Sequence, residues 1–322
     1  MSISLKVDSG QRIDGEDALS SGVSVFLPER AGAHGAPCKA ALVCLAGGNM
    51  NRRYFDLQAA DDPSFSFAHA MTSRGFAVVT IDHIGLGDSS KPKNSYAITH
   101  ELLTRANAHV TADVLRQLRE GRLRGDIAPM PTVPSIGVGH SMGAMMTVLQ
   151  QAAEKQHVAI APLGFSTRGL PEYMPKDALA LSQSEHRAQL PALARKLFVE
   201  DYPVIRSSGN GEQIYGSANA DRRGITALKA ATDCLLPVTA YLSMLPNNVG
   251  PEAAQIDVPV FLGLGERDLA GSTHQIPAAF PRSRDVTLYI QPDAGHSHFL
   301  FPTRSDLFAR FAAWAEWVAS QI

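Results

Sequence analysis

The pentapeptide Gly139-His140-Ser141-Met142-Gly143 constrains the fold more than any other part of this 322-residue chain. A serine between two glycines at this spacing is typical of a sharp turn from a strand into a helix, which presents the serine as a nucleophile. Side chains two positions before and after the serine would collide with the neighbouring strand or helix, and glycine removes both collisions. The flanking segments fit this context, because residues 134–138 (PSIGV) predict a buried strand and residues 142–150 (MGAMMTVLQ) an apolar helix.

The composition is that of an ordinary folded protein, with 45% hydrophobic and 19% charged residues. The formal net charge is −2 and no run of lysine or arginine occurs, so we expect no nucleic acid partner. We expect a cytoplasmic protein without a membrane span, because the chain has no membrane-length apolar stretch and no signal-like N-terminus. Its three cysteines lack metal-ligand spacing, which favours free thiols over disulfides or a metal site (Cys38, Cys44 and Cys234). No cofactor is predicted, and the sequence leaves a homodimer open.

The order of the apolar segments predicts an α/β fold. Two β-rich pieces, 3–7 and 22–27, are expected to form an antiparallel edge. Further strands are predicted at 39–46, 76–82, 134–138, 158–163, 258–264 and 286–290, and helices at 64–73, 100–118, 142–150 and 307–318. Near-continuous apolar strands that alternate with helices predict a mostly parallel sheet with helices on both faces. Sites in such sheets lie at the carboxyl ends of the strands.

The span 165–255 interrupts this alternation, because it has scattered Pro and Gly, mixed helical pieces and no strand of comparable quality. The chain length alone is compatible with two small domains or with one large domain that carries an insertion. We favour the second organisation. It predicts an α/β core made of residues 1–164 and 256–322, with a helical cap inserted at 165–255.

A serine nucleophile needs a base, and the base needs a group that fixes its tautomer. Two polar segments follow predicted strands directly, 265–268 (GERD) and 293–298 (DAGHSH). The chain order Ser141, Asp268, His296 is the order expected for a catalytic triad in this architecture. Other candidates on these segments are Glu266 and Asp293 for the orienting acid and His298 for the base.

With these residues in place, the sequence resembles the α/β-hydrolase superfamily over nearly the whole chain apart from 165–255. Residues 82–89 (DHIGLGDS) resemble the family's D-x-x-G-x-G-x-S loop after its fourth strand. Residues 45–48 (LAGG) resemble the H-G loop after its third strand. The resemblance implies a mostly parallel eight-stranded sheet with a helical cap. Ser141 stands where the haloalkane-dehalogenase and epoxide-hydrolase branches have aspartate, so it implies the serine-nucleophile branch.

The resemblance also favours particular residues for the triad. The family's G-x-x-D spacing falls on Asp268, and a small residue directly precedes a histidine only at Gly295-His296. His298 is then expected to line the pocket or to pack in the core. His140, inside the serine motif, is expected to have a structural role because its side chain should point away from the serine.

Two backbone N–H groups are expected to stabilise a developing oxyanion. One is that of Met142, at the start of the helix after the serine. The resemblance places the other at Gly48, with Asn49 as the alternative because Ala46 replaces the family's histidine. The predicted substrate contacts are Asn49, Tyr54 and His298.

These residues predict a serine hydrolase that cleaves a carboxylic ester or a lactone through an acyl-enzyme. The substrate is expected to be small and apolar, because aromatic and Met residues are frequent in 165–255. The same apparatus serves acyltransferases, lyases and hydrolases of carbon–carbon bonds, so these remain alternatives. A non-catalytic ligand-binding protein on the same fold is a further alternative.

Overall fold

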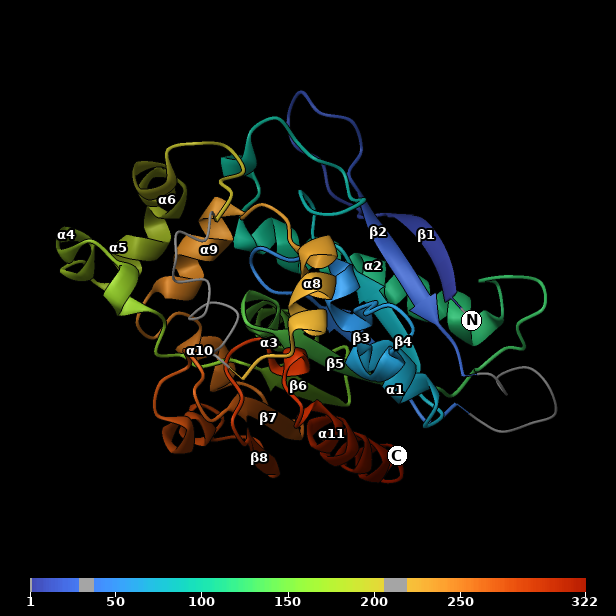
Figure 1. Ribbon diagram of the computed structural model, residues 1–322. Coiled ribbons are helices and arrows are strands. Elements are labelled where there is room, and N and C mark those ends of the chain that lie inside the picture. Colours follow the sequence, from blue (N-terminus) through green and yellow to red (C-terminus); the bar gives the residue numbers. More distant parts are fainter. Residues whose placement is uncertain (1, 29–37, 206–218) are drawn as a thin grey trace.

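The computed structural model describes residues 2–28, 38–205 and 219–322 and centres on one sheet of eight strands (Figure 1). The strand order is β1-β2-β4-β3-β5-β6-β7-β8. The strands are β1 (Ser2–Asp8), β2 (Ser20–Phe26), β3 (Ala41–Leu45), β4 (Ala77–Ile81), β5 (Ser135–His140), β6 (Ala159–Leu163), β7 (Val260–Gly265) and β8 (Val286–Gln291). Strand β2 pairs antiparallel with β1 and β4, and the remaining pairs are parallel. This confirms the predicted sheet and its antiparallel edge.

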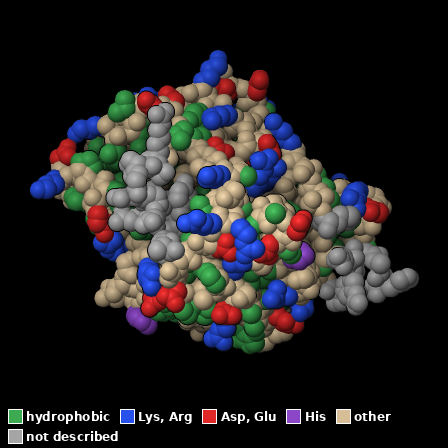
Figure 2. Space-filling view, viewed as in Figure 1, with side chains coloured by type: hydrophobic (Ala, Val, Ile, Leu, Met, Phe, Trp, Pro, Cys, Tyr) green, Lys and Arg blue, Asp and Glu red, His purple; other side chains and the backbone are tan. Residues whose placement is uncertain are grey.

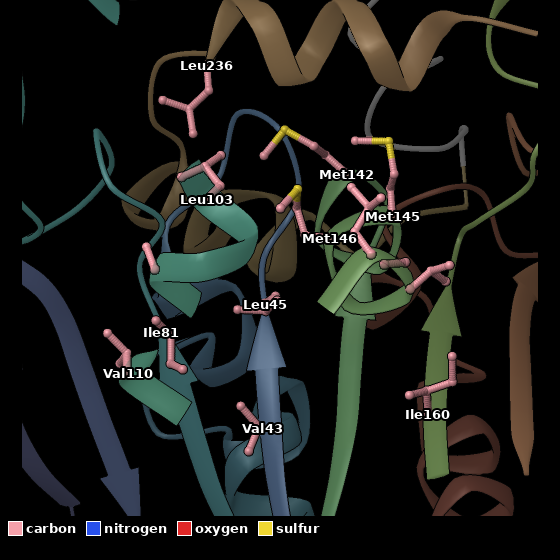
Figure 3. Close-up of a cluster of buried hydrophobic side chains, with 14 of the residues drawn as sticks. Val43, Leu45, Ile81, Leu103, Val110, Met142, Met145, Met146, Ile160 and Leu236 are labelled. Atoms are coloured by element: carbon pink, nitrogen blue, oxygen red, sulfur yellow. The ribbon is translucent and has the colours of Figure 1, made fainter. Parts of the chain in front are cut away.

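Helices cover both faces of the sheet because alternate strand residues point to opposite sides. Val43 and Leu45 of β3 belong to the core under α2 (His100–Glu120) and α3 (Met142–Glu154). Leu42 and Cys44 of the same strand belong to the core under α1 (Phe67–Thr72) and α11 (Arg304–Ala319). Figure 3 shows part of the first core, in which β3 contributes Val43 and Leu45.

The described residues between β6 and β7 form helices joined by loops. Its helices are α4 (Lys176–Leu179), α5 (Gln183–Ala188), α6 (Leu190–Phe198), α8 (Arg222–Ala231), α9 (Pro237–Met244) and α10 (Gly250–Ala253). Helix α6 packs on α9, and both α9 and α10 pack on α3 of the core (Figure 1). The division into a core and a cap at 165–255 stays a prediction.

Single-turn and short 3-10 helices connect these elements. They are η1 (Arg52–Asp56), η2 (Pro63–Phe65), η3 (Ser95–Ala97), η4 (Pro171–Tyr173), η5 (Thr273–Ala279) and η6 (His298–Leu300). Two of them, η1 and η6, lie in segments that follow strands of the sheet, and both place bulky side chains in the interior of the protein.

Charged side chains of both signs are interspersed on the face of the molecule in Figure 2. Arg223 pairs with Asp62 at 3.1 Å and with Asp221 at 2.8 Å. Within residues 2–28, 38–205 and 219–322, none of the helices combines the length and the apolar character needed to cross a bilayer. The three cysteines are free thiols.

Buried neutral histidines make the stability of this fold depend on pH. Burial lowers the pKa of His157 from its ordinary 6.5 to about 4, and burial has the same effect on His83. The unfolded chain takes up these protons below pH 6.5 and the folded chain does not. The stabilisation is therefore complete above pH 6.5 and is lost as the pH falls towards 4, by roughly 3 kcal/mol for each histidine.

We therefore expect His157→Gln to flatten the fall in unfolding free energy between pH 6.5 and 4. Urea unfolding at several pH values measures this dependence. The exposed His69→Gln is the matched control for a histidine lost from the surface. A His157→Gln protein that keeps the native pH dependence would contradict the prediction.

Candidate active site

The backbone at Ser141 is strained, with φ 55° and ψ −121°, where β5 turns into α3. The glycines on either side make this turn sterically feasible. A Cβ atom on Gly139 would overlap the backbone of the first turn of α3, and one on Gly143 would overlap the carbonyl oxygens of Leu45 and Ala46. The turn is therefore wedged against the segment that follows β3.

Three predicted residues form one hydrogen-bonded chain at the carboxyl edge of the sheet. His296 Nε2 lies 2.8 Å from Ser141 Oγ, and His296 Nδ1 lies 2.7 Å from Asp268 Oδ1. Because an ionised carboxylate only accepts, Nδ1 carries the proton and Nε2 is free to accept the hydroxyl proton of Ser141. The three residues follow β5, β7 and β8, which end at the same edge. The arrangement has the geometry for general-base activation of a serine.

The Asp268 carboxylate is completely buried and is satisfied by four donors. The two imidazole donors are His296 and His298, and the backbone donors are Gly265 N–H and Ala270 N–H, each at 3.2 Å. Burial by itself would raise the pKa of Asp268, but the interactions with the two histidines outweigh it and hold that pKa well below its usual range. Asp268 is therefore ionised at neutral pH.

The other two acids lie away from this chain. Glu266 and Asp293 are exposed, and the Glu266 carboxylate accepts the backbone N–H of Asp293 at 2.9 Å. Asp293 also pairs with Arg267 at 2.9 Å. The structure therefore brings only Asp268, of the three candidate acids, to His296 in the described part of the chain.

Of the two places expected for His298, lining the pocket or packing in the core, its side chain takes the second. Its side chain has no exposed area, and its Nε2 lies 2.9 Å from Asp268 Oδ2 rather than near Ser141. Residues 298–300 form η6, which turns the ring inward beneath Asp268. In this geometry His296, and not His298, faces the serine.

His140 lies beneath the site as a buried neutral ring. Burial is the largest cause that holds the pKa of His140 well below its usual range. Its Nε2–H donates to the backbone carbonyl of His296 at 2.8 Å. His140 therefore fixes the main chain that carries His296, and it makes no hydrogen bond to Ser141 in the described residues.

Tyr54 also differs from its predicted placement as a substrate contact. Its ring is completely buried and is stacked between His140, with centroids 4.4 Å apart, and Phe299, with centroids 4.8 Å apart. Helix η1 folds the loop after β3 back under the site, so an aromatic side chain there enters the core. Burial accordingly raises the pKa of the Tyr54 phenol.

The loop after β3 runs beside the serine. A Cβ atom on Gly47 would lie 3.4 Å from Ser141 Cβ, and one on Gly48 would lie 3.7 Å from Met142 Cβ. The N–H of Met142, in the first turn of α3, has no intrahelical acceptor. The predicted oxyanion donors Gly48 and Met142 are therefore neighbours, and their role stays a prediction.

Asn49, predicted both as the alternative oxyanion donor and as a substrate contact, is nearly enclosed. Its carbonyl accepts the N–H of Asp233 at 2.7 Å, which ties the loop to the segment after α8. Its side-chain Nδ2 is buried and has no hydrogen-bond partner among the described residues. It is absent from the cavity lining described next.

A cavity of about 60 Å³ adjoins Ser141 and His296. Its wall is mostly apolar, with two serines and one asparagine. The remaining lining residues are Met142, Met145, Gly164, Phe165, Ser166, Gly169, Leu170, Ser243, Asn248, Leu269 and Ala270. Met142 and Met145 project from α3 beyond the end of β3 (Figure 3). Apart from Met142, no motif in the sequence marked these residues, because they come from segments that tertiary packing brings together.

Comparison with protein-family models matches residues 42–311 to the alpha/beta hydrolase family. The chain belongs to this family. No curated protein matches the sequence.

Several solved structures share the fold of this α/β hydrolase at low identity. A proline iminopeptidase of Mycobacterium smegmatis is 17% identical with a TM-score of 0.62, and the match covers 99% of each chain. A thermostable carboxyl esterase from Bacillus coagulans is 15% identical with a TM-score of 0.63, again over 99% of each chain. An enol-lactonase from Burkholderia xenovorans LB400 is 18% identical with a TM-score of 0.56, over 92% of this chain and 96% of the other.

A cluster of ion pairs around the buried Arg52 and Asp82 side chains, called the Arg52 clamp, holds together the loops after β3 and β4. The Arg52 backbone N–H donates to Asp82 Oδ1 at 2.6 Å, and its guanidinium pairs with Asp82 and, at 2.6 Å, with Asp88. The D-x-x-G-x-G-x-S motif specifies Asp82 and spans Asp88, but no motif marks Arg52, which lies 30 positions away from Asp82. On the same loop, His83 Nε2–H donates to the carbonyl of Ala46 at 3.3 Å.

The packing at the serine turn predicts that Gly143→Ala destabilises the hydrolase. The added methyl group must push α3 away from the carbonyl groups after β3, at a cost of roughly 1–3 kcal/mol or more. Urea unfolding measures the loss. Gly125→Ala is the matched control, because a Cβ atom there meets nothing within 4 Å. Equal stability of the two variants would contradict the predicted close contact.

Proposed function

We propose that this α/β hydrolase is a serine hydrolase that cleaves a carboxylic ester or a lactone of small size. The observation that carries the proposal is the continuous hydrogen-bonded chain from Ser141 Oγ through His296 to Asp268, at 2.8 and 2.7 Å. The family assignment agrees with hydrolase chemistry in general. The esterase and enol-lactonase among the structural neighbours are compatible with this class.

In the proposed reaction, Ser141 Oγ attacks the acyl carbon while His296 Nε2 takes the hydroxyl proton. The N–H groups of Met142 and Gly48 are the proposed donors to the tetrahedral oxyanion. The bond to the leaving oxygen then breaks, and His296 returns its proton to that oxygen. Water attacks the acyl-enzyme with His296 again as base, which releases the acid and restores Ser141. Asp268 stays ionised throughout and holds the imidazole in one tautomer.

We further propose that residues 165–255 act as a cap that determines which acyl group enters. The support is that both ends of this span contribute to the cavity wall, through Phe165, Ser166 and Leu170 near its start and Ser243 and Asn248 near its end. The core supplies the remaining wall, from α3 and from the segment after β7. The cap thus forms the substrate side of the cavity, and the core forms the catalytic side.

Removal of the nucleophile or the base tests the mechanism. We expect Ser141→Ala and His296→Ala each to lower kcat on short p-nitrophenyl esters by roughly 10³-fold or more, because the two residues act as a unit. A fluorophosphonate probe should label the native protein and fail to label Ser141→Ala. His157→Gln serves as a control for a buried histidine outside the site.

Unchanged turnover in Ser141→Ala would refute the mechanism. A native protein that neither hydrolyses esters or lactones nor reacts with the probe would instead indicate a binding protein on this fold.

The small cavity predicts a preference for short acyl chains. One water-sized probe occupies about 10–15 Å³, so a cavity of about 60 Å³ accommodates only a few non-hydrogen atoms. We expect acetyl and butyryl esters to exceed octanoyl esters in kcat/KM by roughly tenfold or more.

Met145→Ala should reduce or reverse this preference, because Met145 lines the cavity. Met146→Ala is the matched control, since Met146 is buried on the same helix but does not line the cavity. Both variants remove a buried methionine, so activities are compared on the fraction shown to be folded. The prediction fails if the two variants have the same chain-length profile.

A further inference from the structure

The carboxylate of Asp268 bonds to two histidines, one through each oxygen. Oδ1 accepts from His296 Nδ1 at 2.7 Å, and Oδ2 accepts from His298 Nε2 at 2.9 Å. Only the first of these bonds belongs to the hydrogen-bonded chain that reaches Ser141. The second joins two side chains that both have no exposed area.

His298 takes no direct part in the proposed reaction. It is absent from the cavity lining, and its ring is enclosed by groups of the site itself. The titratable groups nearest to it are Asp268, His140 at 5.5 Å between centroids, and His296 at 6.5 Å, with Tyr54 stacked behind His140. Its backbone is held as well, because Gln291 Nε2 donates to its carbonyl at 3.1 Å.

The protonation state of His298 follows from its contacts. A carboxylate oxygen only accepts, so His298 Nε2 carries a proton. His298 Nδ1 is buried without a hydrogen-bond partner among the described residues, and a second N–H at this atom would be left without an acceptor. The ring is therefore the neutral Nε2–H tautomer.

We propose that His298 is a positioning residue that holds Oδ2 of Asp268, so that Oδ1 faces His296. A carboxylate that is tethered at one oxygen cannot rotate about its Cβ–Cγ bond without breaking that tether. The tether also withdraws electron density from the carboxylate, which moderates how strongly Asp268 stabilises a proton on His296. This inference rests on the proposed serine-hydrolase function for its kinetic test, but not for its spectroscopic test.

Loss of this donor has a defined effect on the pH profile. A carboxylate with one hydrogen bond fewer is more basic and stabilises the His296 imidazolium more strongly. His296 then becomes protonated, and is lost as a base, at a higher pH. We expect His298→Ala to move the acid limb of kcat/KM upward by about half a pH unit or more. Its kcat should fall roughly tenfold, because the imidazole is less well oriented.

His298→Gln distinguishes positioning from packing. Its side-chain Nε2 can place an N–H donor near that of the histidine, so it should restore both the acid limb and most of kcat. His157→Ala, which removes another buried histidine, is the control for nonspecific loss of packing and should leave the acid limb in place. A folded His298→Ala protein with the native acid limb overturns the inference. The inference is also overturned if the acid limb and kcat of His298→Gln are no nearer to the native values than those of His298→Ala.

A spectroscopic test on the native protein remains valid if His298→Ala does not fold. In protein labelled with ¹⁵N at histidine, His298 should show the Nε2–H tautomer. An Nδ1–H tautomer overturns the proposal. If the native protein hydrolyses no ester and yet His298 has the expected tautomer, the proposed function fails while the assignment of His298 as the holder of Asp268 stands.

Discussion

The contact between Gly143 and the carbonyl groups of Leu45 and Ala46 is the constraint on which the rest of the site depends. It is a contact between two stretches of backbone, so neither can move without the other. The strained turn that presents Ser141 and the loop that contains Gly48 are therefore positioned by one another. This backbone contact by itself sets the position of the nucleophile relative to the proposed oxyanion donors, without any contribution from the side chains of the site.

Electrostatics supply the second constraint. A carboxylate buried without partners would be destabilised by several kcal/mol, and Asp268 avoids this through four hydrogen-bond donors. Two of them are main-chain groups, one at the last residue of β7 and one in the segment after it, and two are histidines from the segment after β8. The same contacts that make the buried charge tolerable also determine which way its oxygens point. Stability and orientation of Asp268 therefore have one cause, and a change at either histidine affects both.

The predictable features of this chain were those encoded within a few residues. The strand pattern follows from apolar periodicity, and the glycine spacing around Ser141 follows from local sterics. The observed eight-stranded sheet matches the one predicted from that pattern. The burial of Tyr54 was not predicted, because it depends on how η1 folds back under the sheet edge, which no local pattern specifies. For the same reason, the sequence could not decide whether His298, in η6, lines the pocket or packs in the core. The Arg52 clamp was missed for a related reason. An arginine in a loop is ordinarily solvated. The partner of Arg52, Asp82, follows a different strand, β4, and only the fold brings the two together.

The cavity wall illustrates the same distinction and has a consequence for function. Its residues run from Ser141 to His296 in the sequence, and Ser243 and Asn248 approach α3 because α9 and α10 pack on that helix. The hydrogen-bonded chain to Ser141 depends on the ends of β5, β7 and β8, and the far side of the cavity depends on that helix packing. The two sets of contacts are largely separate. Substitutions among the helices of 165–255 can therefore change the size of the cavity while the distances between Ser141, His296 and Asp268 stay the same.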